Sequence, residues 1–98
     1  MVTNTQFLQI LKKYFIIADT KNTLSRFLSD RVFINDIMFQ VMNESNISQH
    51  QFDSMLWSNF LKGNVELDYG SPISGYSSTQ YFPHAIEGRY NLIRKVKI

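Results

Sequence analysis

The stretch from Ser45 to Tyr69 constrains the fold more than any other part of the chain. Ser48 and Gln51 have the Ser-x-x-Gln spacing of a capping box, so a helix is expected to begin directly after Ser48. Gly63 can end that helix in the left-handed conformation, and the next residues alternate between apolar and polar side chains, as in a strand. The stretch therefore predicts a helix over about 49–62, followed by the first strand of a hairpin.

One side of this expected helix carries the residues that should face a core. They are Phe52, Met55, Leu56, Asn59 and Phe60. Trp57 and Leu61 lie about 100° or more from the centre of that side, because each residue turns an α-helix by roughly 100°. They could be exposed, or Trp57 could pack under the following hairpin or against the first helix.

Thr3 and Gln6 repeat the helix-start spacing, which predicts a first helix from about Asn4 to Ala18. Apolar residues cover more than half of its circumference: Phe7, Leu8, Ile10, Leu11, Tyr14, Phe15 and Ile17. Such a helix is either central to the core or partly buried against a second copy of the chain, and the sequence leaves both open. A homodimer through the first helix is therefore a prediction.

Three short elements are expected between the two long helices. The sequence predicts a short helix over 23–30, a small strand over 31–34 and a helix that Asn35 caps. Ile34 and Phe39 stand at the two positions of a hydrophobic staple across that cap. The third helix should therefore begin after Asn35 and run to about Asn43. Its inward residues are expected to be Ile37, Met38, Val41 and Met42.

The last third of the chain predicts two strands and a long connection. A strand over 65–69 is followed by residues 70–88, which hold three of the four glycines and both prolines. Residues 89–98 then alternate apolar and charged side chains, which predicts a final strand with a basic exposed side.

Composition excludes several classes of function. The chain has 98 residues, no cysteine and a net charge of +2, so thiol catalysis and disulfides are absent and a polyanionic partner is neither demanded nor excluded. No apolar run approaches the ~18–20 residues of a membrane span, and no secretory signal is recognisable. We expect a soluble cytoplasmic protein without a membrane partner.

Catalytic and metal-binding patterns are also lacking. His50 and His84 have no neighbouring acid at the spacing of a triad or a metal site. Glu66 and Asp68 could form a paired acid site on one strand, but a solvated strand face explains them more simply. We expect no enzyme activity, no cofactor and no metal.

Several segments together resemble the winged helix-turn-helix superfamily, in its compact prokaryotic or viral type. The segments are Ile47-Ser48 with Phe52-Asp53 and Leu56, Gly63-x-Val65-Glu66-Leu67, Ser71-Pro72, and Ala85-Ile86-Glu87-Gly88-Arg89-Tyr90. The resemblance covers about 33–97 well and the N-terminal helices in outline. It implies a mainly α fold with a small antiparallel β-hairpin, in a single domain over 1–98. Its parts would be the N-terminal helices at 1–30, the short strand and helix-turn-helix at 31–62, and the wing hairpin at 63–98.

The resemblance also implies a small regulator or accessory protein that binds double-stranded DNA. A recognition helix in the major groove would present its first residues to the bases. These candidates are Gln49, His50, Gln51, Ser54 and Ser58. Phosphate contacts would come from Arg31, Arg89, Arg94, Lys95 and Lys97. Two plainer interpretations stay open: Gln51 only completes the capping box, and the basic strand is a charged solvent face that protects a sheet edge.

A winged helix can also act as a protein-interaction module without binding DNA. The expected recognition helix supports this alternative, because between Ser48 and Lys62 its only cation is Lys62 and its only acid is Asp53. The candidate partner-binding residues are Trp57, Leu61, Tyr76, Tyr81 and Phe82. The three loop aromatics could equally fold back onto the domain.

Overall fold

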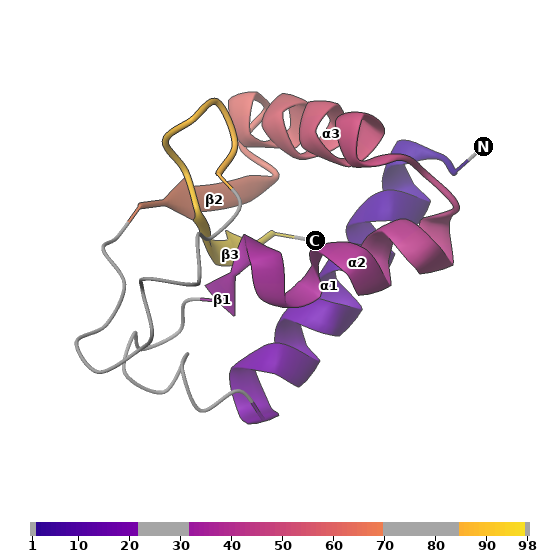
Figure 1. Ribbon diagram of the computed structural model, residues 1–98, viewed down its shortest axis with the longest axis horizontal. Helices are drawn as coiled ribbons and strands as arrows, with labels where there is room; N and C mark the ends of the chain where they lie inside the picture. Colours follow the sequence, from indigo (N-terminus) through magenta and orange to yellow (C-terminus); the bar gives the residue numbers. More distant parts are fainter. Residues whose placement is uncertain (1, 22–31, 70–84, 98) are drawn as a thin grey trace.

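The computed structural model describes residues 2–21, 32–69 and 85–97. The elements in order are α1 (Asn4–Lys21), β1 (Val32–Phe33), α2 (Ile34–Ser45), α3 (Gln49–Leu61), β2 (Val65–Asp68) and β3 (Leu92–Val96). The described part of the chain is thus mainly helical, with a small antiparallel sheet (Figure 1). The predicted helix over 23–30 and most of the loop over 70–88 lie outside the described residues.

Helix α3 forms as the sequence predicts. The Ser48 hydroxyl oxygen accepts the Gln51 backbone N–H at 3.1 Å, and the Gln51 side-chain oxygen accepts the Ser48 backbone N–H at 2.8 Å. At the other end Gly63 adopts φ +83°, and its N–H donates to the Phe60 carbonyl at 3.1 Å. Both predicted helix signals are confirmed, and the helix ends at Leu61, one residue earlier than expected.

Helix α2 begins at Ile34, so the predicted cap at Asn35 is wrong. The residue before the helix is Phe33, which offers no side-chain cap. The Ile34 N–H instead donates to the Asn91 carbonyl at 2.9 Å, so the backbone beside the sheet supplies the acceptor. As a further correction, Phe39 is 61% exposed and is not stapled inward.

Helix α1 starts at the predicted capping box, where Thr3 and Gln6 exchange hydrogen bonds of 2.9 and 3.1 Å. It continues to Lys21, three residues beyond the expected end. Its inward residues Phe7, Leu8 and Leu11 are buried in the core. Within the described ranges, the helices fall short of the length and apolarity needed to cross a bilayer.

The sheet has the order β1-β3-β2, with β3 antiparallel to both neighbours (Figure 1). The expected hairpin is thereby extended to three strands, because Val32–Phe33 pairs with β3. The final strand is shorter than predicted, since residues 86–90 form a turn before it.

Strand β3 contains a bulge that the sequence pattern did not reveal. Glu66 pairs with Lys95 and Leu67 pairs with Ile93, so Arg94 is the extra residue. Arg94 and Lys95 are consequently both exposed, although neighbours in a regular strand point to opposite faces.

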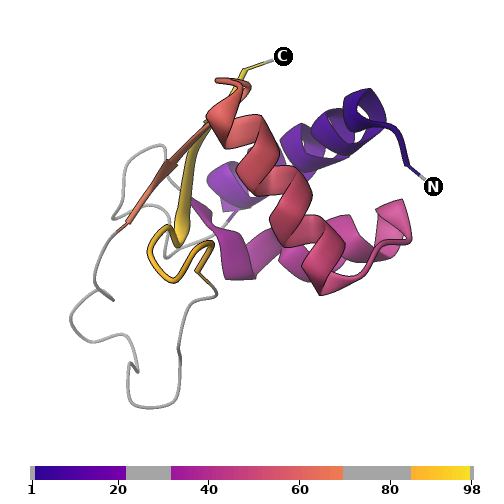
Figure 2. The same ribbon diagram turned by 90° about the horizontal axis from the view of Figure 1, so that it is seen from above.

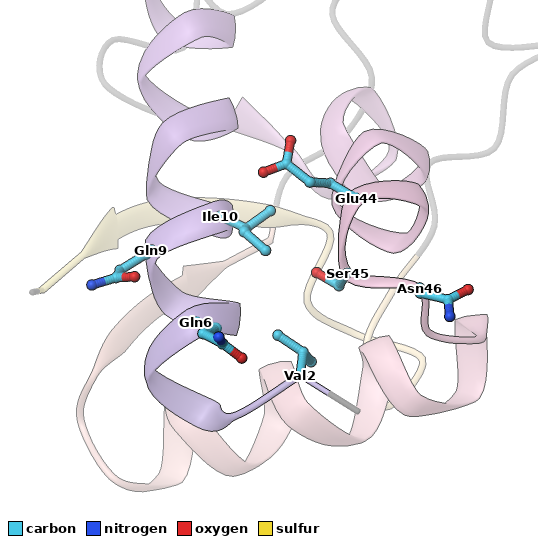
Figure 3. Close-up of a pocket in the computed structure, with 7 residues that line it drawn as sticks. All are labelled: Val2, Gln6, Gln9, Ile10, Glu44, Ser45 and Asn46. Carbon is cyan, nitrogen blue, oxygen red and sulfur yellow. The ribbon is translucent and has the colours of Figure 1, made fainter.

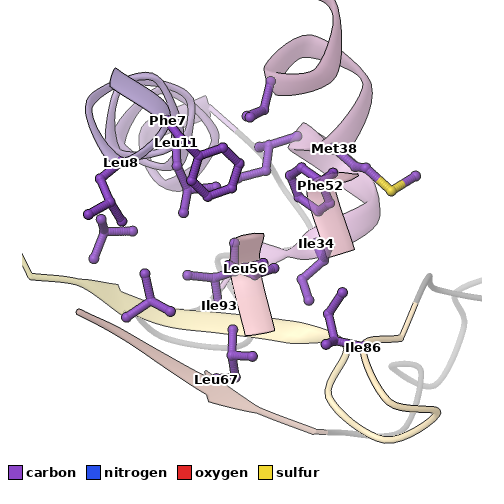
Figure 4. Packing of buried hydrophobic residues seen from close by; sticks show 14 of the residues in the cluster. Phe7, Leu8, Leu11, Ile34, Met38, Phe52, Leu56, Leu67, Ile86 and Ile93 are labelled. Carbon is purple, nitrogen blue, oxygen red and sulfur yellow. The ribbon is translucent and has the colours of Figure 1, made fainter. Parts of the chain in front are cut away.

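The three helices lie on one side of the sheet, and the core fills the space between them (Figure 2). Phe52 from α3 meets Phe7 from α1 edge to face, with ring centroids 5.9 Å apart. Leu56 and Ile93 lie in the same cluster (Figure 4). The inward side of α3 is therefore fixed against both α1 and the sheet.

Candidate functional site

The buried residues of α3 show which side of the helix faces outward. Phe52, Leu56 and Asn59 are fully buried, so the residues about half a turn away face outward. We call them the outer face of α3; they are His50, Ser54, Trp57, Ser58 and Leu61. This face carries no Lys, Arg, Asp or Glu, and Leu61 on it is 67% exposed.

The predicted base-contacting residues have different environments. Gln49, His50 and Ser54 are exposed at the start of α3, and Ser58 is half-buried further along. The Gln51 side-chain oxygen belongs to the capping box. Capping, the plainer interpretation, therefore accounts for Gln51.

Trp57 packs on two other rings in what we call the aromatic cluster. Its ring centroid lies 5.4 Å from that of Phe60 and 6.0 Å from that of Tyr90, and those two rings are 5.0 Å apart. The expectation that Trp57 packs against the hairpin region is confirmed, and its side chain stays half-buried. Sequence reasoning did not identify Tyr90 as the partner, because Tyr90 was expected in a strand.

Arg89 lies over aromatic rings next to this cluster. Its guanidinium carbon is 5.5 Å from the ring centroid of Tyr69 and 5.3 Å from that of Tyr90. Such cation–π contacts are worth about 0.5–1 kcal/mol at exposed sites. Arg89, predicted to contact phosphate, thus has a local structural role.

A hollow of about 330 Å³ lies between α3 and the turn at residues 86–90. We call it the acid–aromatic hollow; its lining residues are His50, Asp53, Ser54, Trp57, Ile86 and Glu87. The two carboxylates come from different segments, one from α3 and one from the turn. The hollow therefore combines an indole wall with two acids.

The turn that carries Glu87 is tightly specified. The Ile86 N–H donates to the Tyr90 carbonyl at 2.7 Å, and the Arg89 N–H donates to the Ile86 carbonyl at 3.1 Å. Glu87 and Gly88 have φ of +54° and +64°, the left-handed region. That conformation costs a residue other than glycine roughly 1–2 kcal/mol, so the buried Ile86 and the hydrogen bonds hold Glu87 in it.

Cations in β3 and directly after it gather around an acid on β2. Lys97 Nζ lies 3.0 Å from Glu66 Oε2, and Arg94 Nε lies 3.9 Å from Glu66 Oε1. The hydrogen bond from Lys97 lowers the pKa of the Glu66 carboxyl below its usual value. We call Arg94, Lys95 and Lys97 the basic strand end; the possibility that Glu66 is half of a paired acid site gains no support.

The basic strand end lies at the far end of α3 from His50. Val96 pairs with Val65, and the Lys97 N–H donates to the Asn64 carbonyl at 2.8 Å, just after α3 ends. Thirteen residues of helix span roughly 20 Å at 1.5 Å each. The structure therefore does not bring the basic strand end together with the predicted base contacts, whereas Arg89 lies on the turn that lines the same hollow as His50 and Ser54. Arg31, Tyr76, Tyr81 and Phe82 lie outside the described residues.

A second hollow, of about 380 Å³, lies between the start of α1 and the end of α2 (Figure 3). Its lining residues are Val2, Gln6, Gln9, Ile10, Glu44, Ser45 and Asn46. The Glu44 carboxylate accepts hydrogen bonds from Lys13 Nζ at 2.6 and 2.7 Å and from the Tyr14 hydroxyl at 2.7 Å. The Ser45 hydroxyl points into the hollow, is buried and has no hydrogen-bond partner.

Ser45→Ala is expected to raise the free energy of unfolding by up to about 1 kcal/mol. The change removes a buried hydroxyl without a partner and places a better helix former at the end of α2. Urea denaturation of both proteins measures the effect. A loss of 1 kcal/mol or more would show that the hydroxyl is satisfied in solution.

Glu44→Gln is expected to change how stability depends on pH. Lys13, and then Tyr14, lower the pKa of the Glu44 carboxyl from its ordinary value of 4.5. A carboxyl with a lowered folded-state pKa stabilises the protein above its unfolded pKa, and that stability is lost as the pH falls through the folded pKa. The urea midpoints of the two proteins should therefore differ at about pH 6 and converge towards about pH 2.5. A difference independent of pH would contradict the ion pair.

No family model, curated protein or solved structure matches this chain. The fold and the surface define a small, mainly helical protein with a three-stranded antiparallel sheet and a neutral, partly apolar outer helix face. Among residues 2–21, 32–69 and 85–97, no group of three or more His, Asp and Glu side chains is placed to hold a metal ion.

Proposed function

We propose that this chain is a winged-helix module that binds a protein partner through the outer face of α3. The order of the elements supports the winged-helix assignment, since α2 and α3 are joined by a short turn and β2 and β3 follow as the base of a wing. The same fold serves DNA-binding and protein-binding modules, so the surface must decide between them.

The observation that carries the proposal is the chemistry of the outer face of α3. Leu61 is strongly exposed there, Trp57 is partly exposed, and none of the residues of this face is a Lys or Arg. Exposed apolar and aromatic side chains are typical of the centre of a protein interface. A DNA-reading helix draws most of its affinity from Lys and Arg beside it.

The test compares two variants that each add one carboxylate to an exposed apolar position. Leu61→Asp alters the outer face of α3, whereas Phe39→Asp alters α2 at similar exposure. The immobilised chain first captures partners from its source cells, and a captured protein is then purified and titrated directly. Leu61→Asp should weaken its affinity by about tenfold or more, the scale of an interface hot spot, and Phe39→Asp by less than about twofold. Equal effects of the two variants would contradict the proposal.

DNA binding is the second candidate, favoured by the bulge that turns both Arg94 and Lys95 outward. In that mechanism residues 49–58 enter a major groove while the basic strand end contacts phosphates. Anisotropy of a fluorescent random-sequence duplex tests it: replacing Arg94 and Lys95 by Ala should weaken binding to every sequence and reduce its salt dependence. Gln49→Ala should relax sequence preference only. Identical affinities of wild type and variants would exclude this candidate.

A homodimer through α1 remains part of the proposal. Ile16 and Ile17 near the end of α1 are 50% and 41% exposed, which leaves apolar area for a second copy. Light scattering at several concentrations would detect the dimer, and a constant monomer mass would exclude it.

A further inference from the structure

We infer that the partner segment that covers Leu61 also carries carboxylate side chains, which bind the cations at the end of α3 and at the end of β3. The inference rests on the proposed function, because it states the chemistry of the segment that contacts the outer face of α3. It follows from the position of the cations beside Leu61, from the excess of positive charge there and from the apolar character of the adjoining helix face.

The end of β3 lies beside the residues that directly follow α3. The Lys97 N–H donates to the Asn64 carbonyl at 2.8 Å, and Val96 pairs with Val65 (Figure 2). Asn64 comes three residues after Leu61, so their Cα atoms are at most about 11 Å apart. An extended segment spans that distance with about four residues. A single partner segment can therefore contact both Leu61 and the basic strand end.

Positive charge is in excess at this junction. Residues 61–67 and 93–97 hold four cations and one acid, namely Lys62, Arg94, Lys95 and Lys97 against Glu66. Subtracting the one acid from the four cations leaves an excess of three positive charges. The Glu66 carboxylate lies 3.0 Å from the Lys97 ammonium and 3.9 Å from Arg94 Nε, so these cations already hold one carboxylate. The remaining positive charge attracts further carboxylates.

The adjoining helix face favours a protein segment over a nucleic acid. Leu61 is strongly exposed beside the cations, and the outer face of α3 carries no Lys or Arg. A duplex that lay on the cations and along α3 would meet an apolar surface, although its binding requires that several phosphates be neutralised. A protein segment can place an apolar side chain on Leu61 and carboxylates next to it.

The first test compares Leu61→Asp with Leu61→Lys, because both variants remove the same exposed apolar side chain and differ in the charge they add. Each is titrated with the purified partner at about 20 mM and at about 0.5 M salt. Partner carboxylates would be repelled by the added aspartate and attracted by the added lysine. We expect Leu61→Asp to bind at least about fivefold more weakly than Leu61→Lys at the lower salt. The ratio should approach one at the higher salt, where screening is strong.

A peptide probe tests the same chemistry without the partner. The full chain is titrated at low salt with acetyl-Leu-Glu-Glu-Leu-amide and with acetyl-Leu-Gln-Gln-Leu-amide, which is neutral and similar in size. Nitrogen-15 correlation spectra follow the amides of Leu61, Lys62 and Asn64. We expect half-saturation with the acidic peptide at about 1–10 mM, because exposed ion pairs contribute little binding energy. The glutamine peptide should bind at least about threefold more weakly.

Lys97→Gln and Lys13→Gln are the matched variants for the peptide titration. Each removes a lysine that pairs with a glutamate, and the two lysine side chains are 45% and 47% exposed. Lys97→Gln should weaken the acidic peptide by about two- to fivefold, because it removes one cation of the basic strand end. Lys13→Gln changes α1 instead and should weaken the peptide by less than about 1.5-fold.

Equal binding of the two peptides, or no saturable response up to about 50 mM, would overturn the inference. Shifts of the same amides by a random-sequence duplex that persist at about 0.15 M salt would also overturn it and assign the cations to phosphate. If both Leu61 variants weaken the partner equally, the outer face of α3 binds a protein that has no carboxylates beside Leu61. If neither variant weakens the partner, the proposed function itself fails.

Discussion

Replacing Phe52 with alanine is expected to lower the free energy of unfolding by about 3–5 kcal/mol. The Phe52 side chain is 0% exposed and joins α3 to α1 through its edge-to-face contact with Phe7. The change removes the free energy gained by burying the ring and the ring's contact with Phe7. It also leaves a cavity in the core. Because a chain of 98 residues is stable by only about 5–15 kcal/mol, much of its stability would be lost. Urea denaturation followed by circular dichroism measures the loss.

Phe39→Ala is the matched control for that experiment. It deletes the same ring from an exposed position on α2, so its effect should stay within about 0.5 kcal/mol. Similar losses for both variants would contradict the packing described for α3.

Asn59→Leu is expected to lower the free energy of unfolding by about 2–4 kcal/mol, although the two side chains are similar in size. The fully buried Asn59 amide donates to the Asn4 side chain and the Met55 carbonyl, both at 2.8 Å, and accepts from Asn64 at 2.9 Å and from Asn4 at 3.1 Å. Leucine would leave the half-buried Asn64 amide without this partner and would break the link to the exposed Asn4 amide, and unsatisfied polar groups are costly. The measurement is again urea denaturation.

Asn43→Leu makes the same chemical change on the exposed side of α2 and should be nearly neutral. A neutral result for Asn59→Leu would mean that the asparagine network can be exchanged for apolar packing. In that event the asparagine hydrogen bonds would not be needed to hold the start of α1 against the end of α3.

Much of the fold could be predicted because its strongest signals are local. The capping boxes at Thr3 and Ser48 and the glycine at 63 act within a few residues, and all three are confirmed. The start of α2 could not be predicted in this way. Its first amide is satisfied by Asn91, which is far away in the sequence, so the local signal at Asn35 was misleading.

The surface was harder to predict, because strand register and turn geometry decide which side chains face solvent and which lie close together. The sequence shows that Arg94, Lys95 and Lys97 are basic, but only the bulge reveals that the first two point outward and that Glu66 lies among them. The acid–aromatic hollow joins Asp53 to Glu87, which are distant in the chain. The Glu87-Gly88 pair did offer a sequence signal for this turn, because glycine often accompanies a turn with left-handed backbone.

The central claim is that the outer face of α3 binds a protein. It is tested most directly by nitrogen-15 correlation spectra of the full chain, recorded with the purified partner and separately with a random-sequence duplex. We expect the partner to shift the amides of His50, Ser54, Trp57, Leu61 and Glu87, and the duplex at 0.15 M salt to leave them unchanged. Shifts by the duplex centred on those amides, with partner-induced shifts elsewhere, would contradict the claim and assign the face to DNA.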